Sequence, residues 1–115
     1  MKKYILLYLS FVGVLSFNSY SQKTELKAAD KKYENFAYID AITTYERVAE
    51  KGYKSVDMFQ KLGNAYYFNG ELEKASKWYT ELFAMTSDLE PKYYYRYAQT
   101  LRSIGENDKA NKILE

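Results

Sequence analysis

From residue 22 onwards, apolar and polar residues alternate with the period of an α-helix. Small and apolar side chains recur every three or four positions in two neighbouring stretches: Phe59, Leu62, Gly63, Tyr66 and Tyr67, and then Ala75, Trp78, Tyr79, Leu82 and Phe83. This spacing places each set on one face of a helix. A third stripe runs from Tyr38 to Ala49, and a weaker one covers 24–33. The pattern therefore predicts a series of amphipathic helices.

Residues that start or stop helices stand between these stripes. Gly52, Gly70 and Gly105 each follow a predicted helix, where glycine readily takes the left-handed conformation that ends it. Ser55 is placed to cap the helix that begins near residue 56, and Pro91 to open the next one, where its missing N–H has no cost. The chain is thus predicted to form short helices joined by tight turns.

The chain also repeats itself. The segment Asn69–Ala75 recurs as Ile104–Ala110 at an offset of 35, and Ala41 and Tyr45 precede Ala75 and Tyr79 by 34. A period of about 34 residues with helical patterning inside it is typical of stacked helix pairs.

Composition agrees with a helical module and excludes much chemistry. The 115 residues include one Pro and five Gly, too few for the many turns of an all-β fold, and neither Cys nor His. Disulfides, Cys/His zinc sites and catalytic dyads built on these residues are therefore excluded. The pairs Glu71/Glu73 and Asp88/Glu90 lie at helix starts, where acidic residues favour the helix dipole. We predict no enzyme activity, no metal and no cofactor.

The N-terminal segment 1–21 resembles a secretory signal peptide. Lys2 and Lys3 precede the 14-residue apolar run Tyr4–Phe17, and Ser19 and Ser21 flank Tyr20 before a predicted cleavage at Gln22. The alternative is a membrane anchor, but 14 helical residues span about 21 Å, against about 30 Å of hydrocarbon. Without a Cys there is no lipoprotein acceptor. We expect export to the periplasm and no direct membrane insertion of the mature segment.

Removal of this segment also changes the charge balance. Two of the 17 basic residues are lost with it, so 15 remain against 15 acidic ones, and the two signs are interspersed. A neutral chain with mixed charges does not favour a nucleic-acid partner.

Phe59-x-x-Leu62-Gly63-x-x-Tyr66 followed by Ala75-x-x-x-Tyr79 resembles the tetratricopeptide (TPR) motif. The resemblance implies an all-α solenoid of about two and a half to three stacked antiparallel helix pairs. Their expected bounds are 22–54, with a degenerate first helix that has Lys32 in place of a tyrosine, 55–90, and a truncated 91–115. We expect the chain to be the N-terminal part of a longer protein, because the second helix of the third pair is cut short and leaves the face of Ile113 and Leu114 uncovered. Exported TPR segments of this kind are similar to the start of outer-membrane-associated proteins with a C-terminal OmpA-like domain.

The TPR resemblance also predicts which side chains line the concave groove. Tyr66, Tyr79, Tyr94 and Tyr97 fall on packing positions. The predicted partner-binding residues are Gln60, Asn64, Tyr67, Phe68, Lys92, Tyr95, Arg96, Gln99 and Arg102. Among them, Asn64, Lys92 and Arg96 resemble part of a clamp for a C-terminal carboxylate, with solvated polar residues as the alternative.

These observations predict a non-catalytic protein-interaction scaffold of the bacterial cell envelope that binds a protein or peptide in its groove. The alternative is a passive helical spacer that positions a distal domain, and a third interpretation places an enzyme's chemistry outside these residues. A scaffold requires Tyr67, Phe68 and Tyr95 to form one exposed patch, whereas a spacer would bury or scatter them. The identity of the partner and the oligomeric state stay open.

Overall fold

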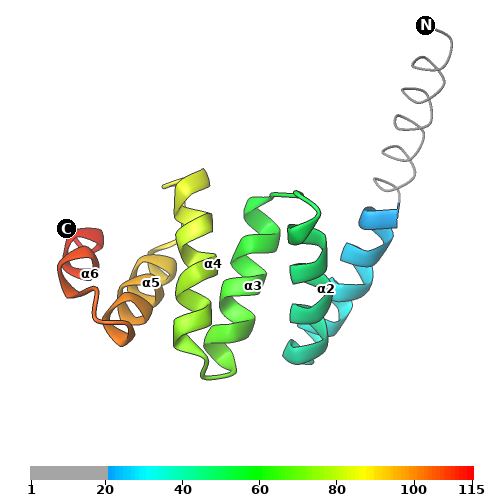
Figure 1. The fold of residues 1–115 in the computed structure, drawn as a ribbon, viewed down its shortest axis with the longest axis horizontal. Helices are drawn as coiled ribbons and strands as arrows, with labels where there is room; N and C mark the ends of the chain where they lie inside the picture. The colour runs from blue at the N-terminus through cyan, green and yellow to red at the C-terminus, as the bar shows by residue number, and fades with distance from the viewer. Residues whose placement is uncertain (1–20) are drawn as a thin grey trace, which may run out of the picture.

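A computed structural model describes residues 21–115, and this part of the chain consists of helices with no strand. The first helix covers residues 21–34. The others are α2 (Tyr38–Glu50), α3 (Val56–Phe68), α4 (Leu72–Met85), α5 (Pro91–Ser103) and α6 (Asn107–Ile113). They stand side by side in one row, in sequence order (Figure 1). The predicted all-α stack of antiparallel helix pairs is confirmed. The predicted signal peptide, apart from Ser21, lies outside the described residues.

The helix boundaries follow from the start and stop residues of the sequence. The Ser55 hydroxyl accepts a hydrogen bond from the Met58 backbone N–H at 3.0 Å, and Pro91 occupies the first turn of α5. Gly70 and Gly105 have φ values of +78° and +83° in the turns after α3 and α5. None of the helices in residues 21–115 is long and apolar enough to cross a membrane.

The second pair is closest where α3 has no side chain. A Cβ atom placed on Gly63 would lie 2.4 Å from Cε1 of Tyr79, so the Tyr79 ring on α4 rests directly on the α3 backbone. Both residues are buried, together with Leu62, Ala75 and Leu82. The small residue of the motif therefore lets a large aromatic ring pack between the two helices.

The first helix is longer than the predicted 24–33, and polar contacts attach it to the following helices. Lys61 on α3 lies 3.2 Å from the Asp30 carboxylate and 2.9 Å from that of Asp57. The buried Tyr45 hydroxyl of α2 donates a hydrogen bond to Asp30. Asp30 and Lys61 are polar, and a search for apolar residues with helical spacing does not identify such partners.

The aromatic packing of α5 differs from the prediction in one position. Tyr93 is buried, whereas Tyr94 is only partly buried and packs edge-on against Phe83, with ring centroids 4.9 Å apart. Tyr97 is buried and stacks on the same Phe83 ring at 4.7 Å. The sequence motif therefore assigned the packing role correctly to Tyr97 and overlooked Tyr93.

Candidate protein-binding surface

A line of aromatic side chains ending in an arginine connects three helix pairs. It begins at Phe36 in the first turn, continues through Tyr38 at the start of α2 and Phe68 at the end of α3, and ends at Arg96 on α5. The ring centroids of Phe36 and Tyr38 are 6.3 Å apart, and those of Tyr38 and Phe68 are 5.5 Å apart. The Arg96 guanidinium lies 4.9 Å from the Phe68 ring centre. We call Phe36, Tyr38, Phe68 and Arg96 the aromatic track.

Arg96 is held in place by neutral groups. Its guanidinium also lies 5.3 Å from the Tyr67 ring and donates a hydrogen bond to Asn64 Oδ1 at 3.1 Å. Aromatic faces attract a guanidinium placed over them and so stabilise its position. No carboxylate among residues 21–115 forms an ion pair with Arg96. No carboxylate of the described residues therefore neutralises the charge of Arg96, and its N–H groups other than the one bonded to Asn64 can donate to a ligand.

Asn64 is the centre of a buried hydrogen-bond network. Its Nδ2 donates to the hydroxyls of Tyr33 and Tyr93, both at 3.2 Å. Its Oδ1 accepts from the Tyr79 hydroxyl at 2.7 Å and from Arg96. These four bonds use the whole capacity of a primary amide. With 5% of its surface exposed, Asn64 is not an open groove residue as the sequence predicted, but the support on which Arg96 rests.

The other predicted groove residues divide between the track and its surroundings. The Tyr67 hydroxyl donates to Gln99 Oε1 at 2.6 Å, so these two join the second and third repeats beside Arg96. Lys92 pairs with Glu90 at 3.5 Å, and Arg102 donates to Asn111 at 3.1 Å. Gln60 is half-buried. A hydrogen bond thus joins Asn64 and Arg96 directly, and Lys92 Nζ lies 5.5 Å from the ring centre of Tyr93. The clamp of these three residues stays a prediction.

Tyr95 lies apart from the other predicted aromatics. It is 66% exposed and lines a separate pocket with Leu89, Tyr94, Ile113 and Leu114, between the start of α5 and the last residues. Tyr67 and Phe68, in contrast, touch each other edge-on at 5.9 Å. The single exposed patch of Tyr67, Phe68 and Tyr95 that was expected of a scaffold is therefore not formed. Tyr67 and Phe68 instead adjoin Tyr38 and Phe36.

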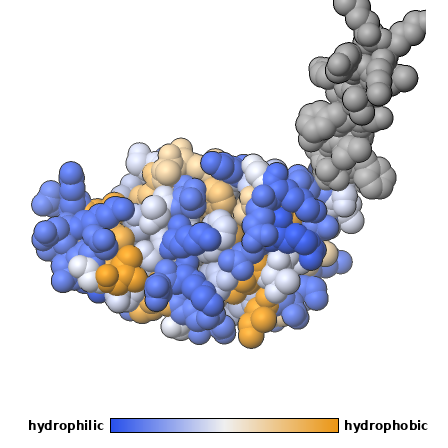
Figure 2. Space-filling model, viewed as in Figure 1, coloured by the Kyte–Doolittle hydropathy of each residue, from blue (hydrophilic) through white to orange (hydrophobic). Residues whose placement is uncertain are grey.

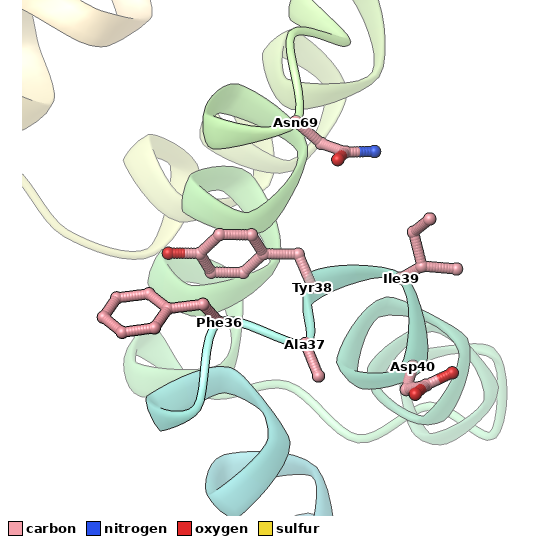
Figure 3. A pocket seen from close by; sticks show the side chains of 6 residues that line it. All are labelled: Phe36, Ala37, Tyr38, Ile39, Asp40 and Asn69. Carbon is pink, nitrogen blue, oxygen red and sulfur yellow. The ribbon is translucent and has the colours of Figure 1, made fainter.

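A shallow pocket lies beside the Phe36 end of the track. Residues 36–40 and Asn69 line it, and the Phe36 and Tyr38 rings project in the same direction from the turn (Figure 3). The face of the molecule seen in Figure 2 is largely hydrophilic, with small apolar areas between the charged side chains. Phe36 was not singled out from the sequence, although it stands one repeat before Gly70 and could have been found as an aromatic in the glycine position of the repeat.

The buried tyrosines are expected to make the folded state less stable at alkaline pH. Burial is the main cause that raises the hydroxyl pKa of Tyr45, Tyr66 and Tyr79 above the ordinary value of 10.0. Each hydroxyl is therefore neutral in the folded chain at a pH where the unfolded chain ionises. The stabilisation is complete below pH 10 and is lost progressively above it.

We expect the melting temperature to be constant between pH 7 and 9 and to fall steeply from pH 10 upwards. Tyrosinate absorbance near 295 nm, measured on the same samples, should rise together with unfolding for these buried rings. Full ionisation of all tyrosines near pH 10 without loss of helix would contradict this expectation.

Comparison with known proteins identifies a fold and no family. No protein-family model matches the sequence, and no match was found among curated proteins. Among 21 matching chains of solved structures is PcrH, crystallised in complex with the chaperone binding region of PopB. The two structures superpose with a TM-score of 0.64 at 18% identity, over 81% of this chain and 74% of PcrH. The chain therefore has a TPR-like helical repeat fold.

Proposed function

We propose that this protein is a non-catalytic scaffold that binds a segment of a partner protein along the aromatic track. The observation that supports this most directly is Arg96: its guanidinium lies over two rings, is hydrogen-bonded to a buried amide and has no carboxylate partner in the described part of the chain. Rigid aromatic rings provide contact area at low entropic cost, and a preorganised arginine pairs well with a carboxylate. The fold of PcrH, crystallised with a region of PopB, supports the compatibility of such a helical stack with this use.

The proposed location is the periplasm of a bacterial envelope, at the outer membrane. Support comes from the basic residues, the 14-residue apolar run and the small residues before Gln22. In this proposal the chain belongs to a longer protein with an OmpA-like domain, and that domain or a partner associates it with the outer membrane.

A passive helical spacer is the second candidate. One observation favours it: Tyr95, the most exposed of the predicted groove aromatics, stands apart from Tyr67 and Phe68. The two candidates differ in whether the residues of the aromatic track contact another protein in the cell.

Site-specific photo-crosslinking in living cells separates them. A photoreactive amino acid replaces Gln99, beside Tyr67, and in a matched protein it replaces the exposed Glu73 on α4. We expect one discrete adduct from position 99, its loss on Arg96→Ala, and none from position 73. Equal or absent adducts at the two positions would favour the spacer. The same experiment without residues 1–21 tests the location, because an envelope partner should then no longer be reached.

A further inference from the structure

Phe36 has a backbone conformation that suits glycine. Its φ is +63°, and in the corresponding turns of the next two repeats Gly70 and Gly105 have +78° and +83°. Phe36 stands one repeat length before Gly70. A bulky residue in the left-handed region is uncommon and strained, because its Cβ crowds the following carbonyl oxygen. The first repeat therefore carries a phenylalanine where its own fold prefers glycine.

The Phe36 side chain adds little stability to offset this strain. Phe36 is 77% exposed, and its ring meets Tyr38 edge-on at 6.3 Å. An apolar ring that stays in water adds little to stability. Strained residues of this kind are found where the strained group is used in recognition or catalysis.

The position of Phe36 indicates what it would recognise. It forms one end of the aromatic track, and the unpaired Arg96 forms the other. At the Phe36 end, the opposite charges of Lys32 and Asp40 lie 3.9 Å apart and offset each other. The track is thus cationic at one end and apolar at the other, and a complementary ligand is anionic at one end and apolar at the other.

We propose that Phe36 anchors an extended segment of a partner protein that carries a carboxylate side chain at Arg96 and a large apolar side chain at Phe36. The three steps along the track are 6.3, 5.5 and 4.9 Å, so an extended peptide spans the track with at most about five residues at ~3.3 Å each. This inference rests on the proposed function and specifies the chemistry of the partner.

Peptides selected by the purified protein from a random ten-residue display library provide the probe. The selected sequences should combine Asp or Glu with a large apolar residue no more than about five positions away. With the best of these peptides, measured by fluorescence anisotropy, Phe36→Gly should weaken binding about ten-fold or more, the order expected for one lost apolar contact. Because glycine suits a positive φ, the same variant should melt no lower than the wild type.

The controls separate this inference from the proposed function. Ile104→Ala removes an exposed apolar side chain at the equivalent turn of the third repeat and should leave affinity unchanged. If Arg96→Ala abolishes binding and Phe36→Gly does not weaken it, the anchor is refuted and the scaffold stands. If the library yields no binder, both are refuted. A lower melting temperature in Phe36→Gly would assign the ring to the fold, and a dimer in sedimentation that this variant disrupts would identify a second copy as the occupant. Either outcome overturns the inference.

Discussion

Replacing Gly63 by leucine is expected to cause a large loss of stability in this protein. Any Cβ at this position lies 2.4 Å from the Tyr79 ring, and leucine adds three further carbons to the same contact. Overpacking of a close helix contact costs about 1 to 3 kcal/mol. At roughly 4 to 8 °C per kcal/mol for a domain of this size, thermal unfolding followed by circular dichroism should show a clear drop in melting temperature.

Ala84→Leu is the matched control for this experiment. It adds nearly the same bulk to an exposed position of α4, where substitutions usually change stability by less than about 0.5 kcal/mol. Equal melting temperatures for the Gly63 variant and the wild type would show that α3 and α4 do not approach each other as described.

Asn64→Ala should cause a loss of stability of similar size, and it should also reduce binding. The substitution leaves the buried hydroxyls of Tyr79 and Tyr93 without their amide partner and frees Arg96. An unsatisfied buried polar group costs about 1 to 3 kcal/mol, so the total loss is expected to be about 3 kcal/mol. Urea unfolding measures the free energy of unfolding directly. Crosslinking from the photoreactive residue at position 99 shows whether the partner still binds.

Tyr33→Phe tests the same network at its edge. It removes one hydroxyl that accepts from Asn64 at a partly buried position, and should cost about 1 kcal/mol and leave crosslinking intact. Similar losses for Asn64→Ala and Tyr33→Phe would mean that the network contributes through one bond and that Asn64 is not its centre.

Some features of this protein follow from local sequence. The stripes of apolar residues predicted the helices, and Ser55, Pro91, Gly52, Gly70 and Gly105 predicted several of their ends, because these depend on side chains within a few positions of one another. The repeat period further predicted that the helices stack as consecutive pairs. Gly63 could be recognised as a close contact for the same reason, since only a small residue fits its place in the repeat.

The candidate binding surface required the tertiary structure. Helical periodicity places Asn64 and Tyr95 on polar faces, but it does not show which of them meets a neighbour in another repeat. Asn64 meets Tyr33 and Tyr93 from the repeats on either side and is buried, while Tyr95 meets the end of the stack. Arg96 acquires its orientation from Asn64 and two rings of the preceding repeat. Sequence alone thus determined the helical stack, and contacts between repeats decided which side chains it presents, because those contacts join residues far apart along the chain.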